Sequence, residues 1–402
     1  ANLYSAKVHK GQTRASGEPY FNHPLEVAYL LTQMRLDEAS VVTGLLHDTV
    51  EDTLTTYEDI REMFGVEIAN MVDGVTKLSQ MNFDTNEHKQ AENFRKMLVA
   101  MAKDIRVILV KLVDRLHNMR SLAPLRPAKR VRISQETMDI YAPLANRLGI
   151  HWLKSSLEDL AFQHIYSEEF AELKPKVDKI TLEKENYIKL VIDILTKELK
   201  KHNIESQVSG RPKHLYSIFK KMKSQHIELE QIYDIIAFRV IVDEPAHCYT
   251  TLGFVHSLWH PIPGRFKDYI GNPKPNDYKS IHTSVIGPKG ERIEIQIRTK
   301  EMHQVCEQGI AAHWEYKDSN KLNEKTRQDF TWLRQLLEWQ KDVTDPNEFL
   351  EIVKFDLFTD EVFVFTPKGE VISLKRSATP VDFAFSIHSE IGMTCAGAKV
   401  NN

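Results

Sequence analysis

The segment VVTGLLHDTVED (residues 41–52) joins a short apolar run directly to a group of acids and imidazoles. The apolar half has the spacing of a helix, and His47, Asp48, Glu51 and Asp52 follow it without a break. On one continuous helix, residues four apart share a face, so His47 is expected beside Glu51 and Asp48 beside Asp52. Ionisable groups are costly to bury beside apolar side chains unless they bind something. The segment therefore indicates a helical domain with a ligand site.

Two more segments complete a possible set of metal ligands. His23 precedes an amphipathic helix, and Asp114 lies in the segment VDRLHN (113–118), at the end of an apolar run. Imidazole and carboxylate ligands together suit manganese, iron or zinc, and a metal-bound water would attack phosphorus or carbon. A His-Asp pair alone is more often a surface or polar contact, but the order H…HD…D resembles that of HD phosphohydrolases. We interpret the other histidines, His9 and His117 included, as structural.

Helical spacing of apolar residues continues through most of residues 1–165, which predicts an all-α domain. It is clearest in 24–34, 39–46, 93–102 and 134–148, and Asp37 and Ser40 are candidate helix caps. Residues 166–202 are strongly charged with a helical pattern, and we interpret them as a solvated connecting helix.

The pattern changes to α+β after residue 203. Residues 231–243 are rich in Ile, Val and Phe and predict a strand, and 292–298 alternate strictly between apolar and polar residues. Between them we expect a helix (246–259) and a loop rich in Pro and Gly (261–276). This domain is expected to span 203–342. A hairpin (361–366 and 370–374) and a helix (382–389) follow, and because the chain stops at 402 and starts inside an expected helix, we expect an excised fragment.

Composition narrows the function classes. The chain has 402 residues, 42% hydrophobic and 27% charged, which is enough to bury sizeable cores and excludes wholesale disorder. Its 53 basic and 56 acidic residues nearly cancel, so a chain-wide basic footprint for nucleic acid is absent. Three widely spaced cysteines and no signal-like or membrane-spanning segment favour a cytoplasmic protein that does not contact a membrane.

A second constellation suggests a nucleotide site. The segment GRPKHLYSIFKKMK (210–223) interleaves basic and apolar residues, and Lys213, Ser217 and Lys221 would share a helical face suited to phosphate. Such charge runs are more often solvated surfaces. Asp234 and Arg239 lie in the apolar segment 231–243, where they are either functional charges in a buried strand or a structural ion pair.

Two carboxylates could meet in this second domain. Glu294 is on the polar face of 292–298, and if that strand neighbours the one carrying Asp234, the pair can hold magnesium for phosphoryl transfer. The loop supplies the cations Arg265, Lys267 and Lys274. Tyr278 would stack on a base or simply pack.

Taken together, the motifs make the chain similar to RelA/SpoT-type enzymes, which make and degrade the alarmone (p)ppGpp. The resemblance rests on strings along nearly the whole chain: FNHP (21–24), HDTVEDT (47–53), DRLHNMR (114–120), APLANRLG (142–149), 210–222, YDIIAFRV (233–240), 263–270, EIQIRT (294–299) and AAHW (311–314). It implies an all-α HD hydrolase domain (1–165), a helical connector (166–202), an α+β nucleotidyltransferase-like synthetase domain (203–342) and the start of a β-grasp TGS domain (350–402).

For the first domain, the resemblance implies removal of the 3′-pyrophosphate of (p)ppGpp. His23, His47, Asp48 and Asp114 would hold Mn²⁺. Glu51 and Asp52 would activate or orient the attacking water. The substrate contacts would come from Arg14 and Asn118.

For the second domain, the resemblance implies transfer of pyrophosphate from ATP to the 3′-hydroxyl of GDP or GTP. Asp234 and Glu294 would position Mg²⁺, and Glu294 would also take the hydroxyl proton. Substrate contacts would come from Arg211, Lys213, Ser217, Lys221, Arg239, Arg265, Lys267, Lys274, Asn276, Tyr278, His282 and Gln296, with Tyr278 stacking on guanine. The chain departs from the family at Asp277 and Lys279, where Gly and Gln are more common.

Two alternatives stay open. The chain could be a different HD–nucleotidyltransferase fusion, or a catalytically silent module that binds guanine nucleotides and reports to a partner. Contacts with ribosome or tRNA are expected only through a C-terminal region that this sequence does not include.

Overall fold

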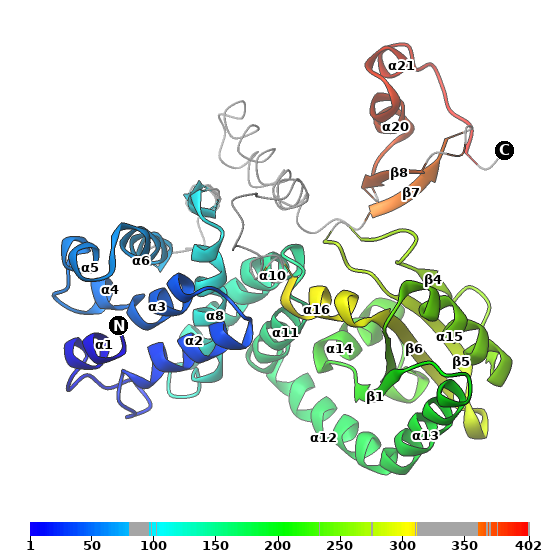
Figure 1. Cartoon of the computed structure of the whole chain (residues 1–402), viewed down its shortest axis with the longest axis horizontal. Coiled ribbons are helices and arrows are strands. Elements are labelled where there is room, and N and C mark those ends of the chain that lie inside the picture. The colour runs from blue at the N-terminus through cyan, green and yellow to red at the C-terminus, as the bar shows by residue number, and fades with distance from the viewer. Residues whose placement is uncertain are drawn as a thin grey trace.

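The computed structural model of the chain describes residues 1–79, 96–97, 99–101, 103–232, 234–274, 276–309, 311, 361–366, 369, 371–375 and 377–400. A helical part, a part built on a mixed sheet, and a small hairpin-and-helix unit follow one another along the chain (Figure 1). None of the helices within these ranges combines the length and apolarity needed to cross a membrane.

The helical part packs around one central helix, α8 (Arg106–Arg120). Eleven of its residues are buried, Lys111 and Asp114 among them, so these two charges need partners inside the core. Its surroundings are α1 (Asn2–Val8), α2 (Asn22–Gln33), α3 (Glu38–Leu46), α4 (Thr49–Asp52), α5 (Tyr57–Phe64), α6 (Val66–Ser79), α9 (Pro127–Glu136), a π-helical turn (Thr137–Tyr141), α10 (Ala142–Arg147) and α11 (His151–Ile165).

The helices predicted at 24–34, 39–46 and 134–148 are confirmed, although the last is built from α9, the π turn and α10. Of the one predicted at 93–102, residues 96–97 and 99–101 are described and are helical, and the rest lie outside the described residues. Asp37 caps α3 by accepting a hydrogen bond from the Ser40 backbone N–H at 3.0 Å. The expectation that Ser40 also caps was wrong, because Ser40 lies inside α3 and is the donor.

The connector is two helices, where one solvated helix was expected. Helix α12 (Ser167–Glu183) ends at Glu183, and after Lys184 the chain continues in a new direction as α13 (Glu185–Lys201) (Figure 1). Along α13, Val191, Leu195 and Leu199 recur at four-residue spacing and are buried against the sheet. The prediction of full solvation failed because the apolar stripe is narrow and the charges around it dominate the composition.

The second part is a six-stranded sheet with the path β1-β2-β6-β5-β3, in which β4 pairs with β5. β2 and β6 are parallel, and the other pairs are antiparallel. The strands are β1 (Ser206–Pro212), β2 (Ile236–Val242), β3 (His260–Pro261), β4 (Lys267–Asp268), β5 (Ile281–Ile286) and β6 (Arg292–Thr299), and the helices are α14 (Leu215–Gln225), α15 (Pro245–Leu258) and α16 (Lys300–Gln308), with 3₁₀ turns at Leu229–Gln231 and Pro288–Gly290.

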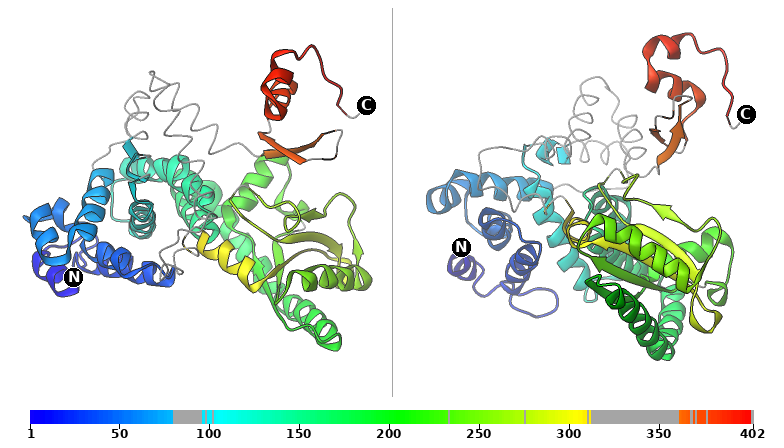
Figure 2. Two further views of the ribbon diagram at one scale, coloured as in Figure 1. Left: turned by 45° about the horizontal axis from the view of Figure 1, so that its top comes forward. Right: turned by 45° about the vertical axis from the view of Figure 1, so that its right-hand side comes forward.

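The two faces of this sheet differ in chemistry. The alternation of β6 places Ile293, Ile295 and Ile297 in an apolar core with α13 and α15. Its polar residues share the other face with Arg239 of β2 and His282 of β5, over which α16 packs (Figure 2). The predicted alternation of 292–298 is therefore confirmed, and the pairing of β6 with β2 meets the condition under which Asp234 and Glu294 could converge.

Helix α11 belongs to both parts. It packs on α8, α9 and α10 of the helical part and on α12, α14 and α16 of the sheet part. At its start the backbones come close together: Gly309 has φ +57°, and a Cβ on it would collide with the carbonyl oxygen of Leu148. The two parts are thus joined by direct packing as well as by the chain.

The C-terminal unit follows the sequence prediction. Strands β7 (Glu361–Phe365) and β8 (Val371–Lys375) form an antiparallel hairpin. Helix α20 (Pro380–Ile387) begins two residues before the predicted start because Thr379 and Asp382 form a capping box, and α21 (Ser389–Met393) follows.

Candidate functional site

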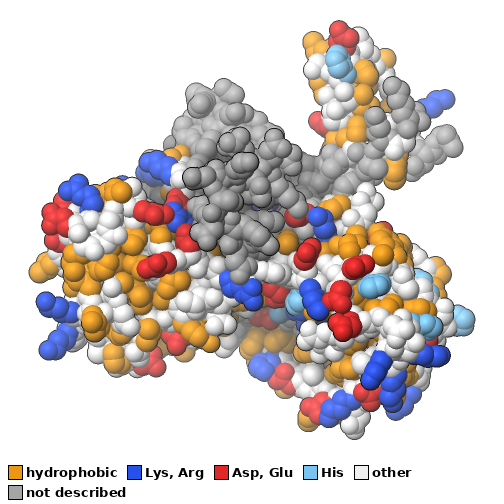
Figure 3. Space-filling view, in the orientation of Figure 1, with side chains coloured by type: hydrophobic (Ala, Val, Ile, Leu, Met, Phe, Trp, Pro, Cys, Tyr) orange, Lys and Arg blue, Asp and Glu red, His pale blue; other side chains and the backbone are white. Residues whose placement is uncertain are grey.

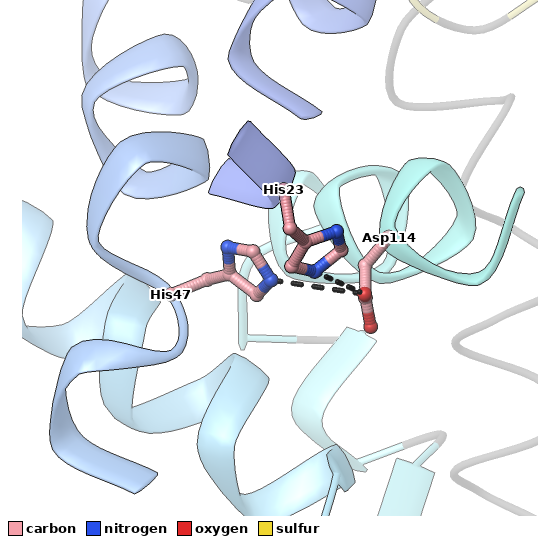
Figure 4. Close-up of side chains that lie close together, drawn as sticks. All are labelled: His23, His47 and Asp114. Carbon is pink, nitrogen blue, oxygen red and sulfur yellow. Dashed lines mark ion pairs between the residues drawn. The ribbon is translucent and has the colours of Figure 1, made fainter. Parts of the chain in front are cut away.

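Four predicted ligands meet inside the helical part. His23 comes from the start of α2, His47 and Asp48 lie between α3 and α4, and Asp114 lies in α8. One ligand atom each of His23, His47 and Asp114 lies within 4.8 Å of the others. The Nε2 atoms of His23 and His47 are 3.1 and 3.7 Å from Asp114 Oδ1 (Figure 4). This donor set fits a divalent metal.

Asp48 lies against both histidines of this cluster. Its Oδ2 lies 3.3 Å from His23 Nε2 and its Oδ1 lies 3.1 Å from His47 Nε2. Burial opposes the charged form of His47, but Asp48 and Asp114 raise the pKa of its imidazole to about 9. His47 Nε2 is buried and faces carboxylate oxygens of Asp48 and Asp114, at 3.1 and 3.7 Å. An atom in this state is suited to coordinate a cation once the imidazole is neutral.

Three residues around Asp114 fix its carboxylate. Lys111 Nζ donates to Asp114 Oδ2 at 2.7 Å, and Asn118 Nδ2 donates to Oδ1 at 2.6 Å. Arg14 in turn donates to Asn118 Oδ1. Burial opposes the Asp114 charge, but the Lys111 ammonium holds the pKa of Asp114 well below its usual range. The two predicted substrate residues, Arg14 and Asn118, therefore adjoin the ligand cluster.

A cavity of about 470 Å³ opens beside this cluster. Five cationic side chains line it: Arg14, Lys111, Arg115, Lys129 and Arg132. Its size and charge suit an anionic small molecule.

The two predicted proton-transfer residues are placed differently. The break between α3 and α4 means that 41–52 is not one continuous helix, so the expected stacking of His47 on Glu51 was wrong. Asp48 and Asp52 do approach, through Tyr20, whose hydroxyl lies 2.8 Å from Asp48 Oδ2 and 2.5 Å from Asp52 Oδ2. Burial and the charge of Asp48 raise the pKa of Glu51.

Sequence reasoning missed Tyr20, Lys111 and His117. His117 was interpreted as structural, yet its Nδ1 lies 2.7 Å from His23 Nδ1 and 3.2 Å from Arg14 Nη1. A lysine inside the otherwise apolar run 107–113 was a signal for Lys111, because a buried ammonium needs a carboxylate. Nothing in the sequence links Tyr20 to this site, whereas the three-residue spacing of Asp114 and His117 was a signal for His117.

The second candidate site lies on the polar face of the sheet. Lys213 Nζ is 2.6 Å from Asp234 Oδ2 and 2.7 Å from Glu294 Oε2, and Lys221 Nζ is 2.5 Å from Asp234 Oδ1. The predicted convergence of the two carboxylates therefore occurs, with an ammonium between them. Figure 3 shows side chains of both charges close together on the visible face of this part.

Two details of this prediction were wrong. Asp234 lies in the turn before β2 and not within the strand, because the 3₁₀ turn at Leu229–Gln231 occupies the start of the predicted strand. Lys213 precedes α14 and so cannot share a helical face with Ser217 and Lys221. All four nonetheless line one cavity of about 310 Å³, together with Arg211, His214, Ile218, Ile232, Ala237 and Gln296.

The cations around Asp234 and Glu294 favour the ionised form of both carboxylates. Burial opposes ionisation of both, but the pKa of Glu294 is held well below its usual range by bonds from His282 and Lys213. Lys213 and Lys221 likewise lower the pKa of Asp234. Gln296 Nε2 donates to Glu294 Oε1 at 3.0 Å. Both acids are ready to hold a divalent cation if Lys213 moves aside.

The predicted base-stacking residue is buried in this structure. Tyr278 is 8% exposed, its hydroxyl lies 2.7 Å from His282 Nε2, and its ring meets His151 of α11 edge-on at 5.1 Å. Lys274 lies over the Tyr278 ring, 5.1 Å from its centroid. The side-chain amide of Asn276 donates to a backbone oxygen of α10 at 2.9 Å. This loop is therefore packed against the helical part.

The remaining predicted contacts lie further out. Arg265 and Lys267 are exposed, and no hydrogen bond or ion pair among the described residues joins them to Asp234 or Glu294. Arg239 pairs with Glu307 of α16 at 3.3 Å. Asp277 has φ +54°, a backbone conformation that favours Gly.

Comparisons with known proteins agree with this division. Family models match an HD domain at residues 1–151, a region found in RelA/SpoT proteins at 210–321, and a TGS domain at 362–402. A GTP pyrophosphokinase of Myxococcus xanthus is 60% identical over all of this chain and 53% of its own length. A probable guanosine-3′,5′-bis(diphosphate) 3′-pyrophosphohydrolase of Synechocystis is 53% identical over all of this chain and 53% of its own.

The bifunctional (p)ppGpp synthase/hydrolase SpoT of Escherichia coli is 48% identical over all of this chain and 57% of its own length. The chain thus spans about half the length of the curated relatives it matches.

Proposed function

The chain belongs to the RelA/SpoT family, and from this premise we propose that it is a bifunctional enzyme that both makes and degrades (p)ppGpp. The observation that supports the proposal is that two separate clusters of ionisable side chains form, one of His23, His47, Asp48 and Asp114 and one of Lys213, Asp234 and Glu294. A silent binding module has no use for either cluster.

In the helical part, His23, His47, Asp48 and Asp114 would hold Mn²⁺. The metal, when bound, supplies Lewis acidity and a water of lowered pKa. Asp52, tied to Asp48 through Tyr20, is placed to accept a proton near this position. The products would be GDP or GTP and pyrophosphate.

Cations in the same cavity would hold the substrate. Arg14 and Asn118 adjoin the metal ligands, which supports a role beside the 3′-pyrophosphate. Lys129 and Arg132 also line the cavity and would supply charge for the other phosphates.

In the sheet part, the 3′-hydroxyl oxygen of GDP or GTP would bond to the β-phosphorus of ATP. The bond between that phosphorus and the oxygen bridging to the α-phosphate breaks, and AMP leaves. Glu294 would take the hydroxyl proton, and Asp234 and Glu294 would position Mg²⁺. Lys213, Lys221 and Arg211 would neutralise phosphate charge in the 310 Å³ cavity.

The partners we propose are ATP, GDP, GTP and (p)ppGpp, with ribosome or tRNA contacts confined to regions outside this sequence. The three cysteines are free, which supports a reducing, cytoplasmic setting.

A paired assay tests the proposal. The chain is incubated with ATP, GDP and Mg²⁺, and separately with ppGpp and Mn²⁺, and the nucleotides are resolved. We expect Glu294→Gln to abolish synthesis only and Asp48→Ala to abolish hydrolysis only, so each variant controls for folding of the other. Absence of both reactions from the unaltered chain would overturn the proposal in favour of a binding module.

A further inference from the structure

Helix α14 presents one face of its first two turns to the 310 Å³ cavity of the sheet part. His214, Ser217, Ile218 and Lys221 line that cavity, and their spacing of three and four residues is that of one side of a helix. Lys221 also contacts Asp234. The placement of this helical face therefore decides where the predicted substrate contacts Ser217 and Lys221 lie.

Helix α14 begins at Leu215 without a cap from its own sequence. The backbone N–H groups of a first turn have no partner within the helix, and the side chain of the N-cap residue normally accepts a hydrogen bond from one of them. Among the described residues, the N-cap residue His214 makes no such bond, and the first turn contains no acidic residue. The start of α14 therefore needs an acceptor from elsewhere in the fold.

Asp159 of α11 supplies that acceptor. Its Oδ1 accepts a hydrogen bond from the backbone N–H of Tyr216 at 2.9 Å. Tyr216 is the second residue of α14, one of the two positions that an N-cap side chain normally serves. The other oxygen, Asp159 Oδ2, lies 3.4 Å from His214 Nδ1. The carboxylate also places a negative charge at the positive end of the helix dipole, so one side chain replaces both features that α14 lacks.

Aromatic packing holds α14 against α11 but leaves its position along the interface to other contacts. Phe162 of α11 stacks on Phe219 of α14 with 4.6 Å between the ring centroids, and it lies 5.8 Å from the ring of Tyr216. Apolar contacts are not directional, whereas a hydrogen bond is. The bond from the Tyr216 N–H to Asp159 is therefore a contact that can fix the first turn of α14.

The backbone just before α14 is tied to the sheet part. The N–H of Lys213 donates to the carbonyl oxygen of Ile235 at 2.8 Å. The chain between Lys213 and Tyr216 is thus held by the sheet part at one end and by Asp159 at the other. Without Asp159 we expect the first turn of α14 to fray, because its N–H groups lose their acceptor, and Ser217 to leave its place in the cavity wall.

We propose that Asp159 is a positioning residue for pyrophosphate transfer, which caps α14 from the neighbouring helix and so holds Ser217 and Lys221 where they contact the phosphates of ATP. The inference rests on the proposed synthetase function and deepens it. Asp159 is absent from the described residues that line the cavity, so it acts through the backbone of α14 and not by touching the nucleotide.

The test measures KM for ATP and for GDP in pyrophosphate transfer by the whole chain. Asp159→Ala should raise KM for ATP roughly tenfold, an effect in the range of a missing helix cap. KM for GDP should stay nearly constant, because the loop at 274–279 that would contact GDP lies outside α14. Asp159→Asn keeps an oxygen that can accept from the Tyr216 N–H, so it should restore most of the ATP affinity.

Asp178→Ala is the matched control. Asp178 lies on α12, which also packs on α14, but its carboxylate pairs with Lys174 within its own helix. This variant loses a carboxylate beside α14 without losing the cap, so its KM for ATP should equal that of the unaltered chain.

A merely structural role predicts a different pattern. Partial unfolding lowers the concentration of active chain, and with it the apparent kcat, but leaves KM unchanged. An unchanged KM for ATP in Asp159→Ala, or an equal rise in Asp178→Ala, would overturn the proposal. An equal rise in Asp159→Asn and Asp159→Ala would assign the effect to the charge of Asp159 and overturn the capping role. Loss of the folded circular dichroism spectrum in Asp159→Ala would assign this residue to the fold and equally overturn it.

Failure of the proposed function gives a separate result. If the unaltered chain transfers no pyrophosphate, calorimetry with ATP and Mg²⁺ measures the same contact as a Kd. A roughly tenfold higher Kd in Asp159→Ala, recovered in Asp159→Asn, would support the inference without the activity. Equal Kd values, or no binding of ATP by the unaltered chain, would refute it.

Discussion

Replacing Lys213 by methionine should weaken the fold and strengthen cation binding at the same time. The ammonium bridges Asp234 and Glu294 at 2.6 and 2.7 Å, and hydrogen bonds to charged groups each contribute about 1.5–3 kcal/mol. Asp234 keeps Lys221, and Glu294 keeps Gln296, so part of the loss is recovered. We expect the free energy of unfolding without Mg²⁺ to fall by about 2–3 kcal/mol.

The cation effect has the opposite sign. In this structure the Lys213 ammonium lies where a divalent cation between the two carboxylates would compete with it. Lys213→Met removes that competitor, so Mg²⁺ should bind more tightly in the absence of nucleotide and should restore part of the lost stability. Synthesis should still fall by about a hundredfold, because a phosphate-neutralising cation is missing.

Urea unfolding with and without Mg²⁺ measures these effects, with Lys221→Met as the matched control. Lys221 contacts Asp234 but not Glu294, so its removal should cost about half as much. Since the folded pKa of Glu294 is depressed, its stabilisation is present above its unfolded pKa of about 4.3 and is lost as pH falls below it. Unchanged stability and unchanged Mg²⁺ affinity in Lys213→Met at pH 7 would refute the bridging role.

Three further predictions concern the helical part and its junction. Tyr20→Phe should lower kcat for ppGpp hydrolysis by roughly tenfold without changing synthesis, because Asp52 loses its tether; an effect on KM alone would contradict this. Gly309→Ala should destabilise by more than about 1 kcal/mol in thermal unfolding, whereas Gly253→Ala, in a helix with open space around it, should stabilise slightly; equal effects would refute the close approach. Burial lowers the pKa of His151 to about 3 in the folded chain, so the unfolded state binds more protons below about pH 6.5 and the free energy of unfolding falls as the pH is lowered from 7 to 5. In urea unfolding, His151→Gln should lose up to about 2 kcal/mol less of this free energy than the unaltered chain. Equal losses would place this imidazole in water.

The spacing of apolar residues predicted the helices and strands correctly where one face of the element is buried. The alternation of β6 determines which of its residues reach the core, so its buried face could be predicted from the sequence, whereas its pairing with β2 could only be assumed. Apolar spacing likewise predicted α2 and α3. The predicted element boundaries were wrong at Asp234, which precedes its strand, and at Lys213, which precedes its helix. A 3₁₀ turn and a strand end have no periodic pattern that shows where they lie.

The site was predictable where residues of unusual chemistry stand in apolar segments. His47, Asp48 and Asp114 gave that signal, and the structure brings them together. Tyr20 and Asp159 did not, because a tyrosine and a helix aspartate are ordinary in sequence. Their roles come from partners far along the chain, which only tertiary packing supplies.

Both clusters bring carboxylates close together, and in each of them cationic side chains of the protein balance the negative charge. Carboxylates gathered for a metal repel each other, and the fold must tolerate them without it. In the helical part Lys111 and a protonated His47 balance Asp48 and Asp114, and in the sheet part Lys213 does so. A metal entering the first cluster must therefore displace a proton, whereas one entering the second must displace an ammonium that can turn to a phosphate. Metal binding should consequently depend on pH in the helical part and on nucleotide in the sheet part.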